Sequence, residues 1–211
     1  MAIFVIRHGE TPGNAARVLQ TPETPLSARG VRQAERLARR LADAGIGHIL
    51  ASDFARAVMT AEPLQAATGA PVAYDPLLQE RNFGDDRGTA YADLGVDLFA
   101  PDYAPPGGED WATFDARVVR AWARIREAAG ATRGHLAVVT HGLVCFSLVR
   151  NHFALPPGET VPMRFGNTAI TLVDAAPPWT VRRLNCTDHL EGSDASDAVS
   201  SGLRNRACAD R

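Results

Sequence analysis

Short apolar runs alternate along this chain with longer stretches whose apolar residues recur at helical spacing. The opening run, AIFVI at 2–6, is continuous and rich in β-branched residues, which is typical of a central strand buried on both faces. Similar runs predict further strands at 46–52, 70–75, 135–140, 167–175 and 179–185. Helical spacing predicts helices at 27–45, 54–69, 111–130 and 143–153. The alternation predicts an α/β fold, a three-layer α/β/α arrangement with a mostly parallel central sheet.

Two segments depart from this alternation. Residues 79–110 are rich in Gly, Asp and Pro, and a loop of that length inside a compact domain is typical of a functional insertion that covers a substrate. After His189 the chain loses apolar periodicity, so residues 191–211 are expected to form a disordered tail. Since 211 residues suit one well-filled core, residues 1–190 are expected to form a single domain. Within the second helix, Pro63 is expected to cause a kink or an early end.

Composition excludes several classes of function. The net charge is -2, so no overall positive field favours nucleic acid or an anionic membrane. All 22 basic residues are arginine, which excludes lysine-based catalysis. The three cysteines include no close pair, which argues against a disulfide framework and favours a reduced, cytoplasmic setting. No apolar run approaches the roughly 20 residues that span a bilayer.

Polar side chains follow the apolar runs at three predicted strand ends. Arg7 and His8 end the first strand, and Gly9 permits the sharp turn that brings both into one site. Arg56 lies just past the second strand, and His141 with Gly142 repeats the opening pattern before a helix. Because ligands bind beyond the carboxyl ends of strands in such sheets, these residues are expected to share one surface.

The residue types at this surface suit a phosphoryl group. Arg7 and Arg56 provide planar donor forks for phosphate oxygens, and the helix after His141 presents free N–H groups to an anion. A neutral imidazole such as that of His8 can attack phosphorus at neutral pH. Departure of an alkoxide needs a proton, and Glu80 is the best-placed carboxyl in the sequence to donate it.

Six ordered blocks of the sequence resemble a known family. They are RHGET at 7–11 with Asn14, PLSARG at 25–30, SDFARAVMTA at 52–61, ERNFGDDRG at 80–88, PPGGE at 105–109 and THG at 140–142. Together they resemble the signature of the histidine phosphatase superfamily, the phosphoglycerate-mutase-like proteins, over almost all of residues 2–190. The resemblance implies a metal-independent phosphatase that hydrolyses small phosphate monoesters without a cofactor.

The resemblance also implies roles for single residues. His8 would be the nucleophile that forms a phosphohistidine, and Glu80 would donate the proton and later activate water. His141 would stabilise the charge of the transferring phosphoryl group together with the phosphate-binding residues Arg7, Asn14, Arg56 and the Gly142 N–H. Residues that would choose the substrate, a small phosphorylated metabolite, are Gln20, Thr21, Arg81, Phe83 and Glu109. The oligomeric state stays open.

Alternatives to the phosphatase are a cofactor-dependent phosphoglycerate mutase and a catalytically silent module that binds phosphorylated ligands. The stretch between Gly88 and Pro105 contains no arginine to grip a bisphosphate, which favours hydrolysis over mutase chemistry. His8, His141 and Glu80 could form a zinc ligand set, but Arg7 would repel the cation. The arginine-rich face of the helix at 27–45 is better explained as solvated surface than as a nucleic-acid site.

Overall fold

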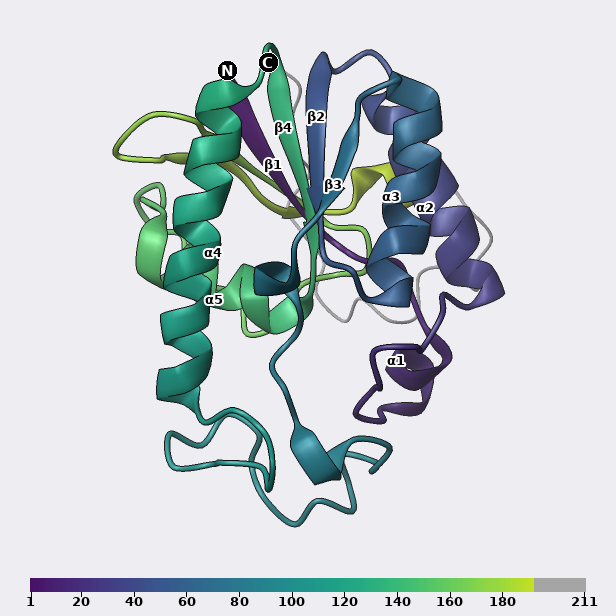
Figure 1. Ribbon diagram of the computed structural model, residues 1–211, viewed down its shortest axis with the longest axis vertical. Helices are drawn as coiled ribbons and strands as arrows, with labels where there is room; N and C mark the ends of the chain where they lie inside the picture. Colours follow the sequence, from purple (N-terminus) through teal and green to yellow (C-terminus); the bar gives the residue numbers. More distant parts are fainter. Residues whose placement is uncertain (192–211) are drawn as a thin grey trace.

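The computed structural model describes residues 1–191, which fold around a six-stranded sheet (Figure 1). The sheet order is β3-β2-β4-β1-β5-β6. Neighbours among β1 to β4 run parallel, whereas β5 is antiparallel to both β1 and β6. The strands are β1 (Ala2–Arg7), β2 (Ile46–Ala51), β3 (Val72–Tyr74), β4 (His135–Thr140), β5 (Ile170–Asp174) and β6 (Val181–Cys186). The predicted α/β fold with a mostly parallel sheet is confirmed.

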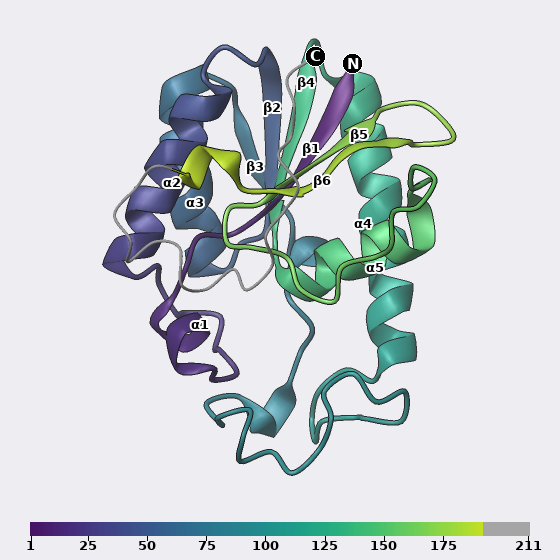
Figure 2. The same ribbon diagram turned by 180° about the vertical axis from the view of Figure 1, so that it is seen from behind.

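Helices cover both faces of the sheet, α2 and α3 on one and α4 and α5 on the other, as Figures 1 and 2 show. The helices are α1 (Pro12–Ala16), α2 (Ala28–Leu41), α3 (Ala55–Thr68), α4 (Trp111–Ala131) and α5 (Gly142–His152). Short 3-10 helices are η1 (Pro76–Leu78), η2 (Gly84–Asp86) and η3 (Asp188–Leu190). Among residues 1–191, no helix is long and apolar enough to cross a membrane.

The central strands β1 and β4 are buried on both faces of the sheet, which explains why their sequences are continuously apolar. Ile3, Val5 and Val138 pack into the core beneath α4 and α5. Ile6 and Val139 point to the opposite face and join the core beneath α2 and α3. Because alternate side chains enter two separate cores, both faces of β1 and β4 must be apolar. Their polar residues therefore gather where the strands end.

Two helices differ from the sequence prediction. The expected shortening of α3 at Pro63 is wrong, because the helix continues through it to Thr68. Burial of Ala57, Ala61 and Leu64 against the sheet and α2 supplies the packing that holds the turns on either side of the proline. The five-residue helix α1 was not predicted from periodicity. Of the predicted tail at 191–211, residues 192–211 lie outside the described residues.

The segment at 79–110 lies beyond the carboxyl ends of the parallel strands, at the lower end of the molecule in Figure 1. Backbone hydrogen bonds join it to the chain that follows α1. Tyr91 N–H donates to the Arg17 carbonyl at 2.9 Å, Leu19 N–H to Thr89 at 3.0 Å, and Gly88 N–H to Leu19 at 2.7 Å. This short antiparallel contact fixes the segment over the strand ends.

Candidate active site

His8 leaves β1 in a tight turn that a side chain at position 9 would obstruct. A Cβ on Gly9 would lie 2.7 Å from the Gly30 carbonyl oxygen, so the turn packs directly on the start of α2. His8 is 2% exposed, and its Nδ1 lies 2.7 Å from the Gly9 carbonyl oxygen. Because a carbonyl only accepts, this contact places the proton on Nδ1 and leaves the Nε2 lone pair available.

Burial lowers the pKa of His8 well below its ordinary value, and the nearby Arg56 and Arg7 guanidiniums lower it further. The imidazole is therefore neutral at physiological pH. The expected nucleophile has the protonation state that attack on phosphorus requires.

His141 lies beside His8, with ring centroids 5.2 Å apart. It follows β4 and caps the N-terminus of α5. Its Nε2 is 2.8 Å from Ser52 Oγ at the end of β2, while its buried Nδ1 has no partner. Burial, followed by the charge of Arg56, lowers the pKa of His141 well below its ordinary value. The ring is neutral and carries a polar atom that the protein does not satisfy.

Arg7 and Arg56 each use part of their guanidinium on a backbone carbonyl. Arg7 Nη1 donates to Phe165 at 2.5 Å, and Arg56 Nη1 donates to Thr21 at 2.9 Å. In both, the buried Nε–H has no partner. Burial lowers the pKa of Arg56 to about 10, so it stays cationic at neutral pH. Two arginine cations, each with a buried N–H donor that has no protein partner, form a site that suits an anion.

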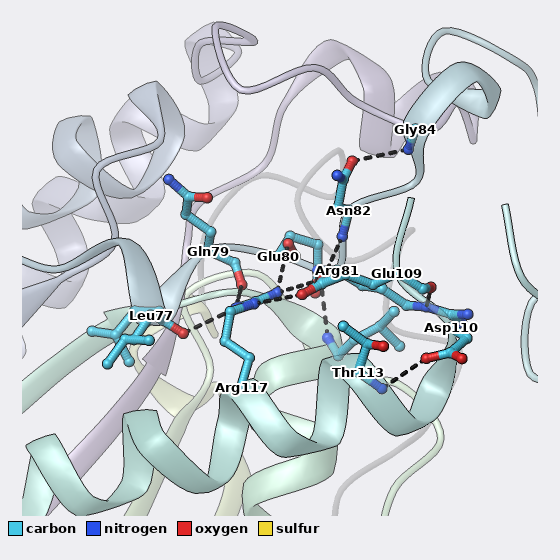
Figure 3. Close-up of polar contacts among 12 residues, drawn as sticks. Leu77, Gln79, Glu80, Arg81, Asn82, Gly84, Glu109, Asp110, Thr113 and Arg117 are labelled. Carbon is cyan, nitrogen blue, oxygen red and sulfur yellow. Dashed lines mark hydrogen bonds and ion pairs between the residues drawn. The ribbon is translucent and has the colours of Figure 1, made fainter. Parts of the chain in front are cut away.

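Glu80 brings its carboxylate to the same place from the segment after η1. Its Oε1 accepts from the Arg81 N–H at 3.0 Å (Figure 3). Its Oε2 accepts from the Leu143 N–H at 3.2 Å. A Cβ on Gly142 would lie 3.9 Å from Glu80 Oε2 and 3.5 Å from Arg7 Nε, which places the helix start against both groups. Burial raises the pKa of Glu80 against the opposing effect of hydrogen bonds and arginines.

Asn14 is held at the site by its own short helix. Its side chain accepts from the Thr11 N–H at 3.2 Å, which closes the capping box of α1. The same oxygen accepts from Asn167 Nδ2 at 3.1 Å, and Asn167 Nδ2 also lies 3.2 Å from the His8 carbonyl. Asn167 therefore ties Asn14 to the backbone of His8. The sequence prediction missed Asn167, because it put this residue at the start of the strand predicted at 167–175 and not at the end of a strand, whereas β5 begins at Ile170.

These residues open into a cavity of about 1090 Å³. Among the residues that line it are Arg7, His8, Asn14, Arg56, Glu80 and Gly142. His141 is fully buried next to His8 and is not among the described residues that line the cavity. Of the five predicted substrate-selecting residues, Gln20, Arg81 and Phe83 line the cavity. Thr21 and Glu109 are not among the described residues that line it.

Arg81 and Glu109 are held in the protein instead of being free for substrate. The Arg81 guanidinium lies 4.3 Å from the ring centroid of Trp111 and donates to the Tyr103 and Glu109 carbonyls. Glu109 forms an ion pair with Arg117 at 2.7 Å. Both contacts fix the segment at 79–110. Arg81 is itself part of the cavity wall, whereas Glu109 affects the wall through the backbone of this segment.

Three arginines that the sequence prediction did not select also line the cavity: Arg17, Arg87 and Arg164, here called the arginine rim. They come from the end of α1, the segment at 79–110 and the loop before β5. Within residues 1–191, no carboxylate lies within ion-pair distance of any of them. Arg87 lies in the sequence block at 80–88, whereas none of the six blocks contains Arg17 or Arg164. The backbone contact between residues 17–19 and 88–91 joins the segments that carry Arg17 and Arg87.

A model of the histidine phosphatase superfamily (branch 1) matches residues 3–187. The chain belongs to this superfamily. Superfamily relatives include a Proteus mirabilis protein named "Probable phosphoglycerate mutase GpmB", 31% identical over 90% of this chain and 95% of that protein. This superfamily member also resembles solved structures. The alpha-ribazole phosphatase from Shigella flexneri is 28% identical with a TM-score of 0.74, and the match covers 89% and 97% of the two chains.

A second solved structure is the mycobacterial glucosyl-3-phosphoglycerate phosphatase in complex with VO3. It is 25% identical with a TM-score of 0.74, and the match covers 88% of this chain and 99% of that one. The match to the superfamily model at 3–187 includes the strand ends and most of the residues that line the cavity. The family resemblance read from the sequence blocks is confirmed.

Proposed function

We propose that this protein is a phosphatase that hydrolyses small phosphate monoesters through a phosphohistidine on His8. One observation carries the proposal. Among the described residues, Arg7 Nε, Arg56 Nε and His141 Nδ1 are buried without a protein partner. Arg7 ends β1, His141 follows β4, and Arg56 lies in the first turn of α3, which follows β2, so three adjacent strands deliver them to His8. Unsatisfied buried donors are costly, and a phosphoryl dianion supplies the acceptors that all three need.

In the first step, His8 Nε2 attacks phosphorus while the bond from phosphorus to the ester oxygen breaks. Arg7, Arg56 and the Gly142 N–H offset the charge on the transferring oxygens. The protonated carboxyl of Glu80 gives its proton to the departing oxygen, so the alcohol leaves neutral. The raised pKa of Glu80 favours this protonated form.

In the second step, water attacks the phosphohistidine, and the Glu80 carboxylate takes a proton from that water. The bond between nitrogen and phosphorus breaks, phosphate leaves, and His8 and Glu80 return to their starting states. Glu80 loses a proton in the first step and regains one in the second, so the same carboxyl serves first as the acid and then as the base.

The arginine rim bears on the leaving group. Other partly buried arginines of this chain are paired with carboxylates. Arg117 forms an ion pair with Glu109, and Arg29 forms one with Glu10. Arg17, Arg87 and Arg164 have no such partner among residues 1–191, although Asp97 and Glu191 also line the cavity. We propose that the substrate is a small phosphorylated metabolite whose alcohol carries a second anionic group, a carboxylate or a phosphate.

The second candidate is a phosphoglycerate mutase, which the name of the Proteus relative and the arginine rim favour. A mutase would return the phosphoryl group from His8 to a hydroxyl of a second substrate instead of to water. A silent binding module is a third candidate, and the complete set of His8, Glu80 and His141 argues against it.

The test is phosphate release from a panel of phosphomonoesters in chelator-treated buffer, with His8→Ala compared with the wild type. Release that persists under chelation, is lost in the variant and passes through an acid-labile phosphoenzyme supports the phosphatase. Transfer only when bisphosphoglycerate is supplied would point to the mutase. Binding of phosphate esters with no turnover and no phosphoenzyme would leave the binding module.

The cellular setting and partners are part of the same proposal. Cys145 and Cys186 are buried free thiols, which suits the reduced cytoplasm. We propose a cytoplasmic enzyme formed by a single domain over 1–190, with no nucleic-acid or membrane partner and no metal. Fractionation of cells that produce the protein would test the location.

A further inference from the structure

Arg117 lies on α4, outside the cavity, and reaches the chain segment that carries Glu80 (Figure 3). Its Nη1 donates to the Leu77 carbonyl at 2.9 Å and to the Gln79 carbonyl at 2.8 Å. Its Nη2 donates to the Glu80 carbonyl at 3.2 Å and to Glu109 Oε2 at 2.7 Å. Its Nε donates to Glu109 Oε1 at 2.8 Å. All five N–H groups of the guanidinium are used.

Glu109 extends this contact to the other side of Glu80. Its Oε2 also accepts from the Asn82 N–H at 2.8 Å, and its own N–H donates to the Asn82 carbonyl at 2.8 Å. Burial acts to raise the pKa of Glu109, but hydrogen bonds from Arg117 and Asn82 outweigh it, so the pKa is lowered. The carboxylate is therefore ionised and pairs with a side chain that is only 12% exposed.

The segment from Gln79 to Phe83 belongs to no helix or strand. It lies between η1 and η2, so no ladder of backbone hydrogen bonds holds it. The Gln79 and Glu80 carbonyls are instead bonded by Arg117, and Asn82 by Glu109. The backbone is thus fixed on both sides of the residue whose carboxyl enters the cavity.

We propose that Arg117, together with Glu109, is a positioning residue that fixes the backbone at Glu80 so that its carboxyl reaches the ester oxygen of the substrate. The proposal rests on the phosphatase function proposed above. A general acid must lie within hydrogen-bond distance of the oxygen that it protonates, so a small shift of the segment removes its contribution. Neither Arg117 nor Glu109 needs to touch the substrate for this role.

The test separates positioning of the acid from general damage to the site. An alkyl phosphate leaves as a basic alkoxide and needs the proton, whereas p-nitrophenyl phosphate leaves as a weakly basic phenolate and needs it much less. Arg117→Lys keeps the charge but replaces five fork donors with three on one nitrogen. We expect kcat on the alkyl ester to fall about tenfold or more, with kcat on the aryl ester changed by less than about threefold.

The controls use matched variants. Arg120 lies on the exposed side of the same helix, so Arg120→Lys should leave both activities unchanged. Glu109→Gln keeps the size of the side chain but removes its charge, and it should lower the ratio of alkyl to aryl activity in the same direction. It also decides the question if Arg117→Lys fails to fold by circular dichroism.

An equal fall on both esters, or an unchanged ratio in a folded Arg117→Lys or Glu109→Gln protein, would overturn the positioning role. Neither result would contradict the proposed phosphatase function, because the wild type would still hydrolyse both esters. A wild type that forms no phosphoenzyme and releases no phosphate would instead reject the proposed function itself. The two failures are therefore distinguishable within one experiment.

Discussion

Ser52 and His141 stand at the ends of the adjacent strands β2 and β4, with Ser52 Oγ 2.8 Å from His141 Nε2. The Phe54 N–H donates to the same hydroxyl at 3.3 Å, so the hydroxyl proton is available to His141. Donation to Nε2 assigns the imidazole proton to Nδ1, the atom that lacks a protein partner. Ser52, which is not among the residues that line the cavity, thus leaves His141 with an Nδ1–H that can donate, and in the proposed mechanism it donates to a phosphoryl oxygen.

Ser52→Ala should therefore weaken catalysis without removing the nucleophile. We expect kcat to fall about tenfold, less than the ~10²-fold loss typical of deleting a transition-state donor. Steady-state kinetics would measure this, with His141→Asn as the larger reference loss. An unchanged kcat in Ser52→Ala would show that the hydroxyl does not set the tautomer.

The pKa shifts predict the pH dependence of turnover. The pKa of His8 is lowered well below 6.5, so acidification from neutral pH leaves the nucleophile deprotonated. The pKa of Glu80 is raised above 4.5, so the same acidification increases the fraction of protonated acid. We expect kcat on an alkyl ester to rise as the pH falls from neutral towards the raised pKa of Glu80.

Glu80→Gln is the control for this profile. It should be slower and should lose the decline on the alkaline side, because an amide does not titrate. A wild-type kcat that falls as the pH drops from about 7 to 6 would mean that His8 titrates near the ordinary value for histidine.

The sheet and the strand-end residues could be predicted from sequence because the apolar runs stop at the residues that carry the chemistry. Arg7 is the last residue of β1, and His8 and His141 directly follow β1 and β4, so the pairing of these two strands brings the three residues together. Asn167 could not be found in this way. It stands at the start of the strand predicted at 167–175, and the structure places it in the loop before β5, where its contact with Asn14 joins parts of the chain that are far apart in the sequence.

Glu109 shows a different limit of what can be predicted from the sequence. Its block in the sequence indicated a place near the substrate, and the structure puts it next to the segment of Glu80 but turns its carboxylate to Arg117. A carboxylate outside a helix and an arginine two turns into it share no sequence spacing that predicts a pair. Proximity to a site could be predicted, whereas the direction of the side chain could not.

The arginine rim gives a prediction about substrate choice. Arg164→Ala should raise KM about fivefold for an ester with a second anionic group, equivalent to the ~1 kcal/mol of a solvent-exposed ion pair. Paired esters such as 3-phosphoglycerate and glycerol 3-phosphate would measure the difference, and bis-phosphorylated esters would test phosphate as the second anion. Equal changes in KM for charged and uncharged leaving groups would contradict the proposed substrate class.

The turn after β1 predicts a steep dependence of stability on one glycine. A Cβ on Gly30 would lie 2.0 Å from the Glu10 carbonyl oxygen. The atoms nearest to this Cβ all belong to the backbone of Glu10, so no side chain can rotate away to make room. Gly30→Ala must push the start of α2 away from the turn that follows His8, so we expect a loss of about 3 kcal/mol in unfolding free energy.

Gly130 provides the matched control in α4, because a Cβ there would meet nothing within 4 Å. Gly130→Ala should stabilise the protein by about 0.5 kcal/mol, since alanine costs less backbone entropy in a helix. Chemical denaturation of the two variants and the wild type would measure both changes. Similar stabilities for Gly30→Ala and Gly130→Ala would mean that the turn behind His8 yields without cost, and that the close contact with α2 does not hold the nucleophile in place.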